Sequence, residues 1–315
     1  MNARLLLGGI KSYLPLPGAG YKGTGGTVTG AYCYAVWLRH LTLIARYLGG
    51  AAVPRGTVVE LGPGDSIGLG LAAILSGSET YVGLDVLEHA SNETNLRVLD
   101  ELVALYRRRA AIPDEKSFPR LFPRASSNDF PAALFNESVL SDRLSDVQVA
   151  RLRDTLRHSS SSTGSIQYRC PWSHRSVDPS SADLIISQVA LEYMDHTESR
   201  DDLRANIRAM ANWLRPGGVM SHQVDFSSPG GQPWNHHWAY GDLAWRIMRG
   251  RRPCYENRVS LSRYVALFEE AGCEVIGVER VEQLGLQAEH VAPRFRKLPA
   301  SDFSTSAALI VAIKR

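Results

Sequence analysis

The sequence has few cysteines, and none of them form a motif. Its 315 residues contain only Cys33, Cys170, Cys254 and Cys273, which are far apart and make no CxxC pair. So sparse a set fits neither a zinc ribbon nor the dense disulfide framework of a small secreted domain. We therefore expect reduced thiols and a cytoplasmic protein.

Long apolar runs are also missing. The stretch at 5–10 is short and broken by glycine, and the stretch at 41–53 is interrupted by Arg46. Neither has the form of a signal-peptide core or the length of a transmembrane helix. The sequence therefore predicts no membrane span.

Neither sign of charge dominates the chain. There are 35 Lys and Arg residues against 32 Asp and Glu residues, a formal net charge of +3, and 44% of the residues are hydrophobic. That small charge cannot supply the dense basic stripe of a non-specific nucleic-acid binder. The hydrophobic content is enough for one large or two modest cores. We expect a globular protein whose partner is not nucleic acid.

What the sequence does contain is an alternation of strands and helices. Residues 57–61 (TVVEL) form a β-branched run, and a glycine turn and an apolar helical stretch follow at 62–75. A second strand is predicted at 81–86 and a helix at 92–109. Together these segments make a parallel βαβ unit.

The rest of the chain continues the pattern around two exceptions. Residues 113–165 are rich in proline and serine, with a helix candidate near 144–157, and we expect an insertion that caps the acceptor site. Residues 1–50 are expected to form an N-terminal helical extension, with an amphipathic helix at 31–49. Further strands are predicted at 165–169, 182–188, 219–226, 273–280 and 306–313, and helices at about 200–214 and 261–271. All seven strands belong to one α/β domain, residues 51–315.

The turn after the first strand has the chemistry of a cofactor site. Glu60 ends the strand, and the glycines of 62–68 would let a ligand approach the backbone at the positive end of the next helix. A dinucleotide fingerprint requires glycine at 67, where this chain has Ile67, and Glu60 would repel a pyrophosphate. Asp85 ends the second strand, where a carboxylate can accept both hydroxyls of a ribose. The pattern favours a positively charged nucleoside ligand over NAD.

The E-x-G-x-G turn, Asp85 and the L-R-P-G-G turn at 214–218 together resemble the class I S-adenosylmethionine-dependent methyltransferases over roughly residues 55–313. The resemblance implies a Rossmann-like fold, with a mostly parallel seven-stranded sheet and an antiparallel last strand, and S-adenosylmethionine as cofactor. Matched to the family motifs, the implied cofactor-binding residues are Glu60, Gly62, Gly64, Ser66, Asp85, Ser187 and Gln188.

The sequence departs from the family after the third strand. An acidic residue commonly meets the adenine amino group there, and this chain has Arg169-Cys170-Pro171-Trp172 instead. Two interpretations of Trp172 stay open: its indole stacks on the purine, or it packs in the core. We include Trp172 among the cofactor-binding candidates.

The segment after the fourth strand indicates the kind of acceptor. Nucleic-acid amino methyltransferases carry an N/D-P-P-Y/F element here, and residues 187–193 read SQVALEY. Residues 189–196 (VALEYMDH) instead resemble the corresponding segment of small-molecule methyltransferases, with Glu192 retained and Tyr193 in place of the usual histidine. A small polar acceptor is implied, with Glu192 beside it.

Candidates for the chemistry cluster around the fifth strand. Methyl transfer from a sulfonium is an in-line displacement, so the protein must align the nucleophile and, for an alcohol, remove its proton. We predict His222 as the general base, with Asp225 and His237 as further catalytic residues, because strand ends converge at one edge of a parallel sheet. Trp234, Asn235 and His236 are predicted to bind the acceptor, and such an aromatic and polar mixture fits a sugar ring.

Two other interpretations of this region remain open. His222 can be a hydrogen-bonded core residue, and tryptophans 234, 238 and 245 can pack a lid helix. A metal site is not expected: His222 and Asp225 face opposite sides of a regular strand, and the carboxylate pair that Mg²⁺ prefers is missing.

The run SHQVDF, followed by WNHHWAY and by Asn257-Arg258, further resembles a bacterial subgroup that accompanies surface-polysaccharide genes. The favoured hypothesis is a cytoplasmic O-methyltransferase that acts on a sugar or glycoconjugate precursor. The alternatives are N- or C-methylation of another small metabolite, a cofactor-binding subunit without catalysis, and an NAD oxidoreductase. The oligomeric state stays open.

Overall fold

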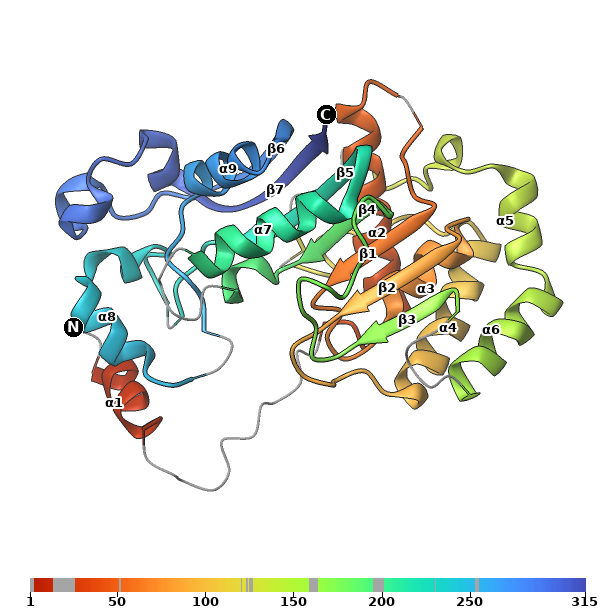
Figure 1. Cartoon of the computed structure of the whole chain (residues 1–315), viewed down its shortest axis with the longest axis horizontal. Helices are drawn as coiled ribbons and strands as arrows, with labels where there is room; N and C mark the ends of the chain where they lie inside the picture. The colour runs from red at the N-terminus through yellow and green to blue at the C-terminus, as the bar shows by residue number, and fades with distance from the viewer. Residues whose placement is uncertain are drawn as a thin grey trace.

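A single seven-stranded sheet organises the computed structural model (Figure 1). The strand order is β3-β2-β1-β4-β5-β7-β6, with β7 antiparallel to both of its neighbours and every other pair parallel. This Rossmann-like architecture confirms the predicted fold. The strands are β1 (Thr57–Leu61), β2 (Thr80–Leu84), β3 (Ile166–Arg169), β4 (Ala182–Gln188), β5 (Leu214–Asp225), β6 (Cys273–Glu282) and β7 (Thr305–Lys314). The structure describes residues 3–13, 26–50, 52–119, 121–122, 124, 127–158, 164–194, 201–229, 231–252 and 255–315.

Helices cover both faces of the sheet because successive strand residues alternate between the two faces. Val58 and Leu184 share a core with one helical layer, whereas Val59 and Ile185 share a core with the other. The first layer contains α2 (Gly30–Tyr47), α3 (Gly68–Leu75), α4 (Asn92–Arg107), α5 (Glu137–Arg143) and α6 (Asp146–His158), and the second contains α7 (Asp201–Trp213) and α9 (Leu261–Glu270).

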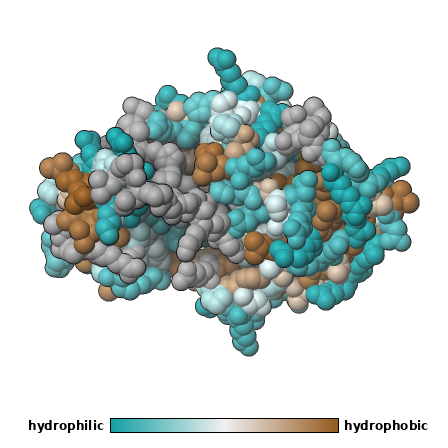
Figure 2. All heavy atoms as spheres, turned by 90° about the horizontal axis from the view of Figure 1, so that it is seen from below, coloured by the Kyte–Doolittle hydropathy of each residue, from teal (hydrophilic) through white to brown (hydrophobic). Residues whose placement is uncertain are grey.

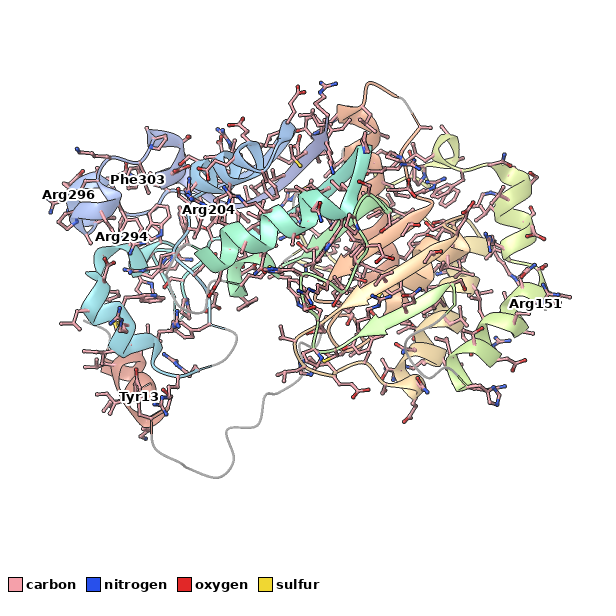
Figure 3. All side chains as sticks on the ribbon, in the orientation of Figure 1. Tyr13, Arg151, Arg204, Arg294, Arg296 and Phe303 are labelled. Carbon is pink, nitrogen blue, oxygen red and sulfur yellow. The ribbon has the colours of Figure 1, made fainter. Side chains whose placement is uncertain are left out.

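Two further helices, α1 (Ala3–Lys11) and α8 (Asp242–Arg249), pack together at one end of the molecule. Seen from below, hydrophobic atoms gather on the surface at this end (Figure 2). Tyr13 lies there, and Arg151 of α6 lies at the opposite end (Figure 3). None of the helices in the described ranges is both long and apolar enough to cross a bilayer. Short 3₁₀ helices lie at 132–134, 191–193, 236–239, 288–290, 293–295 and 300–304.

The strand order reverses between β1 and β4, and this reversal positions the site. From β1 the chain builds the sheet outward through β2 and β3, and then returns to the other side of β1 with β4 and β5. The loops that leave β1 and β4 therefore diverge, and ligands of open α/β sheets bind in the crevice formed there. The site is expected at the carboxyl ends of these two strands.

The predicted N-terminal extension needs a correction in its second half. Most of α2 is buried, and α2 packs against α3 and α4. Its Trp37 indole N–H donates to Ser76 Oγ at 2.9 Å, beneath the surface. Segment 30–47 is therefore a layer of the domain core and not an appendage to it.

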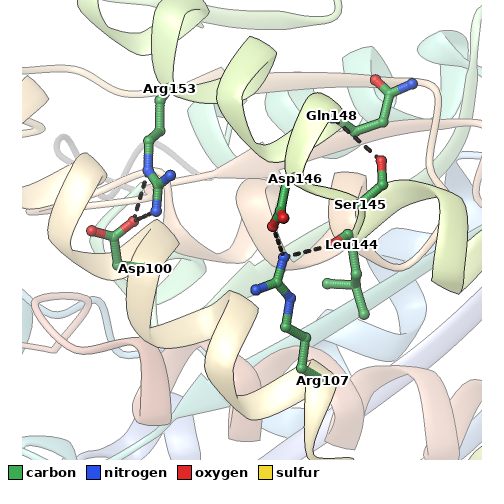
Figure 4. Close-up of polar contacts among 7 residues, drawn as sticks. All are labelled: Asp100, Arg107, Leu144, Ser145, Asp146, Gln148 and Arg153. Carbon is green, nitrogen blue, oxygen red and sulfur yellow. Dashed lines mark hydrogen bonds and ion pairs between the residues drawn. The ribbon is translucent and has the colours of Figure 1, made fainter.

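The predicted cap at 113–165 also needs a correction, because part of it packs on the domain core and part of it lines a large cavity. Helices α5 and α6 pack on α3 and α4 through buried leucines and a valine, and exposed ion pairs join Arg153 to Asp100 and Arg107 to Asp146 at 2.7 Å (Figure 4). The polar sequence of α5 gave no signal strong enough to predict it. Among the described residues of 113–165, those that line this large cavity are Ser117, Phe118, Pro119, Leu121 and Phe122. We therefore restrict the proposed capping role to residues 117–119 and 121–122. The predicted serine run at 159–162 lies outside the described residues.

Candidate active site

Two adjoining cavities open where the site is expected. The smaller holds about 400 Å³ and lies at the ends of β1, β2 and β4, and the larger holds about 1200 Å³ and extends over the end of β5. Gly62, Val189 and Tyr193 line both cavities. Val189 has φ 55°, a strained conformation for a β-branched residue, and such strain is concentrated at functional sites. Because the two cavities share these lining residues, they can hold two molecules that react with each other, one in each cavity.

Asp85 is fixed at the wall of the smaller cavity. The Gly64 N–H donates to Asp85 Oδ2 at 3.2 Å, and the Val86 N–H donates to Oδ1 at 2.7 Å. Gly62 and Gly64 have φ values of 70° and 71°, which glycine adopts without strain. The predicted glycine turn and the acidic residue after β2 thus come together around a space that is large enough for a nucleoside.

The opposite wall combines a predicted residue with two that sequence reasoning missed. Trp172 lines the smaller cavity and also packs edge-to-face on Trp213, with ring centroids 5.9 Å apart, so its ring borders both the space for a ligand and the core. His174 Nε2 and Asn206 Oδ1 lie 2.9 Å apart in a hydrogen bond, and both residues line the cavity. No motif marks this pair in the sequence, because its members lie on a loop and on α7.

Glu60 is a buried acid at the wall of the larger cavity. The Tyr81 hydroxyl donates to Glu60 Oε2 at 2.6 Å. Burial raises the pKa of Glu60 to about 8, the Tyr81 hydrogen bond opposes this rise, and the charge of Asp85 adds to it. Gln188, also predicted from the sequence, lines the same cavity. A positively charged ligand would favour the ionised form of Glu60.

Two predicted cofactor contacts lie behind the cavities. Ser66 is fully buried, where its hydroxyl donates to the Thr27 carbonyl and accepts from the Gly68 N–H, so it holds the turn in place. Ser187 is also fully buried and bonds to His222. Neither side chain lines either cavity, and we correct both to supporting residues.

The prediction that His222 is the general base also needs correction. Its side chain is fully buried on the face covered by α9 and stacks on Phe268, with ring centroids 5.5 Å apart. His222 Nδ1 lies 2.8 Å from Ser187 Oγ in a hydrogen bond, and His222 lines neither cavity. The alternative interpretation, a hydrogen-bonded core histidine, fits this environment, because an acceptor has no path to the imidazole.

Replacing His222 by alanine should therefore lower stability and not the rate. The cavity beside Phe268 and the loss of the Ser187 hydrogen bond should together cost about 2–4 kcal/mol of unfolding free energy. Burial lowers the pKa of His222 to about 3, so the native state resists protonation. The stability that the neutral His222 contributes is fully present above about pH 6.5, the pKa of histidine in the unfolded chain. It is lost as the pH falls toward 3, because the unfolded chain then binds a proton that the folded chain does not. Urea unfolding of His222→Ala at several pH values tests this.

An exposed histidine, His290, supplies the control for that experiment. His290→Ala should leave the unfolding free energy almost unchanged. If His222→Ala unfolds like the unchanged chain and yet loses turnover, His222 must reach the acceptor after all.

The histidines and aromatic residues after β5 form a packed lid. His237 is fully buried, with its ring 5.9 Å from Trp238 and 5.7 Å from Trp245, and burial holds its pKa well below the usual value, with Arg258 adding to the effect. The Asn235 side chain bonds to the Leu286 N–H and C=O at 2.7 and 3.0 Å. Both residues hold the lid together. We therefore correct the prediction that His237 is catalytic and that Asn235 binds the acceptor.

The remaining lid candidates lie nearer to the larger cavity. Trp234 lines it, while its indole N–H donates to the Gln283 carbonyl at 2.8 Å. His236 is partly buried, and its Nε2 lies 3.3 Å from Ser228 Oγ, itself a lining residue. Trp234 thus stays an acceptor-binding candidate, and His236 acts on the cavity through Ser228.

Three carboxylates gather at the end of β5. Asp225 and Glu256 line the larger cavity, and Glu192 lies buried behind them, with its Oε1 accepting the Asp225 N–H at 3.3 Å. Burial raises the pKa of Glu256 and, more strongly, that of Glu192, and the negative charge of Asp225 contributes to both shifts. Sequence reasoning found Asp225 and Glu192 but missed Glu256, which no pattern connects to β5.

The larger cavity otherwise offers neutral hydrogen-bonding groups. No lysine, arginine or histidine is among its lining residues in the described ranges. Such a lining can bind hydroxyl groups or a cation. Its polar uncharged side chains are Thr27, Tyr32, Ser117, Gln188, Tyr193, Gln223, Ser227, Ser228, Gln232, Gln283 and Ser306.

Comparisons with known proteins return structural neighbours only. No family model matches the sequence, and no curated protein matches it either. An S-adenosylmethionine-dependent methyltransferase from Mesorhizobium loti is 14% identical, with a TM-score of 0.41, over 88% of this chain and 100% of that one. Phosphoethanolamine N-methyltransferase 2 from Haemonchus contortus, in complex with S-adenosyl-L-methionine, is 13% identical, with a TM-score of 0.40, over 91% of this chain and 57% of that one. Similarity this low supports no conclusion about activity, and the fold is defined by its own strand order.

Proposed function

We propose that this chain is an S-adenosylmethionine-dependent methyltransferase. The observation that carries the proposal is the placement of Asp85, which the Gly64 N–H fixes at a nucleoside-sized cavity, one strand away from the buried acid Glu60. Asp85 would bind the ribose hydroxyls, Trp172 the adenine, and Glu60 with the glycine turn the charged methionine part. The cofactor supplies an electrophilic methyl group. The residues present suit its donor and acceptor groups.

Cofactor binding is expected to release a proton from Glu60. At pH 7 this carboxyl is mostly protonated, because its pKa is raised to about 8. The positive charges of S-adenosylmethionine should lower that pKa, so that binding releases about one proton. Calorimetry in buffers of different ionisation enthalpy measures the proton count. S-adenosylhomocysteine, which lacks the sulfonium charge, should release fewer protons.

Matched carboxyl variants test the origin of the proton. Glu60→Gln should abolish the release, and Glu88→Gln, at an exposed position near Asp85, should leave it unchanged. Equal release from both variants would remove Glu60 from the site. If neither compound binds and NAD raises the melting temperature instead, the oxidoreductase alternative replaces the proposal.

We propose further that the acceptor is a small polar molecule that carries hydroxyl groups, in the first place a sugar or glycoconjugate precursor. Support comes from the many amide and hydroxyl side chains of the larger cavity and from the Trp234 ring beside them. Asp225 and Glu256 take the place of His222 as candidate bases. A cytoplasmic location and a link to polysaccharide genes belong to this hypothesis and rest on the sequence alone.

Methylation of an amine is the second candidate, because one feature favours it. Glu60, Asp225 and Glu256 line the larger cavity, whose described lining holds no basic side chain to offset them. Where these carboxyls are ionised, their field concentrates cations, and a bound cation in turn favours the ionised form. An assay of S-adenosylhomocysteine release with matched panels of neutral sugars and of amines separates the two acceptor classes.

A further inference from the structure

Helices α1 and α8 form a unit outside the sheet and its two helical layers. The helices cross at Gly9, where an added Cβ would overlap the Ile247 and Met248 carbonyls. Ser12 reinforces the crossing, since its hydroxyl donates to the Gly9 carbonyl at 2.5 Å and accepts the Arg251 N–H at 2.7 Å. The proposed methyltransferase site uses no residue of either helix.

The unit exposes several large apolar side chains. Leu7, Ile10 and Tyr13 are 56%, 48% and 49% exposed, and Leu243 and Ile247 of α8 are 72% and 38% exposed. They are five of the ten large hydrophobic side chains that are exposed in the described structure. We call these five residues the α1/α8 patch, and Figure 2 shows hydrophobic atoms on the surface at the end of the molecule where the two helices lie. Scattered exposed hydrophobics need no explanation, whereas a concentrated group marks an interaction surface.

The surroundings of the patch are positively charged. Lys11, Arg246 and Arg251 are exposed beside it. The chain has no acidic residue before Glu60 and none between 243 and 255. Asp242, at the start of α8, pairs with Arg258 at 2.8 Å and with Arg294 at 2.5 Å, so it does not neutralise these cations.

We propose that the α1/α8 patch docks the protein on the surface of an anionic phospholipid membrane. Apolar side chains on amphipathic helices enter the boundary between headgroups and acyl chains, while flanking lysine and arginine contact the lipid phosphates. The positive charges beside the patch complement the negative charge of such a membrane. A second copy of the chain would bring two cationic patches face to face, which like-charge repulsion disfavours.

Vesicle sedimentation of the full chain tests the proposal. The protein should bind vesicles of equimolar phosphatidylcholine and phosphatidylglycerol, should not bind phosphatidylcholine alone, and should dissociate as the salt concentration rises. The double variants Leu7→Ser/Leu243→Ser and Lys11→Glu/Arg246→Glu should each lower the partition coefficient by about tenfold or more.

Control variants carry the same changes elsewhere. Val147→Ser/Leu284→Ser alters two side chains that are 62% and 78% exposed, and Lys116→Glu/Arg151→Glu makes the same charge change, with Arg151 at the far end of the molecule (Figure 3). Both controls should bind vesicles normally. Equal losses in patch and control variants, or no binding to the anionic vesicles, would overturn the proposal.

A measurement of the oligomeric state distinguishes membrane binding from the alternative, in which a second copy of the chain covers the patch. If sedimentation velocity shows a dimer that Leu7→Ser/Leu243→Ser dissociates, while the unchanged chain ignores vesicles, the patch is an interface between copies. Melting temperatures should stay equal across all four double variants, since each altered side chain is exposed.

Discussion

The variant Asp85→Ala is expected to bind S-adenosylmethionine about a hundredfold more weakly than the unchanged chain. Hydrogen bonds to a charged group contribute about 1.5–3 kcal/mol each, and under the proposed function the carboxylate accepts two ribose hydroxyls. The substitution also removes the acceptor of the Gly64 and Val86 N–H groups, which loosens the glycine turn. Isothermal titration calorimetry measures the affinity directly.

Two further variants serve as controls for Asp85→Ala. Glu88→Ala removes a nearby exposed carboxylate and should leave the affinity unchanged. Gly64→Val should weaken binding independently, because its φ of 71° strains a β-branched residue. Unchanged affinity in Asp85→Ala, together with normal binding in Gly64→Val, would show that the cofactor does not occupy the smaller cavity.

The residues proposed to bind the cofactor could be placed at one edge of the sheet from the sequence, because their signals are local. Glu60, the glycines at 62 and 64, and Asp85 lie directly after two strands whose β-branched pattern is plain, and parallel strands bring their carboxyl ends to one edge. The structure places these four residues around the two cavities. The same local signals located all seven strands and the helices that follow β1, β2 and β4.

The acceptor half could not be predicted from local signals, because it depends on which helical layer covers each strand residue. The sequence showed that His222 and Asp225 face opposite sides of β5, but not which side is open. Phe268 of α9 covers the His222 side, whereas Asp225 lines the larger cavity, together with residues 117–119 and 121–122. Glu256 reaches this space from a distant loop, so only the folded chain brings it beside Asp225.

The same dependence on tertiary packing explains the lid. Tryptophan and histidine side chains bind sugars and also fill cores, and their sequence pattern is identical in both roles. In the structure Trp238 stacks on Phe295, with ring centroids 5.5 Å apart, and His237 lies between two indoles. Most of the segment therefore packs inward, and only Trp234 reaches the larger cavity directly.

For an alcohol acceptor, Glu256→Gln and Asp225→Asn should lower the maximal rate by about a hundred- to ten-thousand-fold while leaving the affinity for S-adenosylmethionine nearly intact. Both carboxyls line the cavity that the acceptor would occupy. A general base works best when its pKa lies near the working pH, and burial raises the pKa of Glu256 toward that range, with the charge of Asp225 contributing to the rise.

The dependence of the rate on pH separates the two carboxyls. If Glu256 is the base, the rate of the unchanged chain should rise with pH as this carboxyl loses its proton. Asp225→Asn removes a neighbouring negative charge, which lowers the pKa of Glu256, so the rising limb should move to lower pH. Glu256→Gln should abolish that limb altogether. If both variants turn over an alcohol normally but lose affinity for an amine, the carboxylates bind a cationic acceptor, and amine methylation replaces the sugar hypothesis.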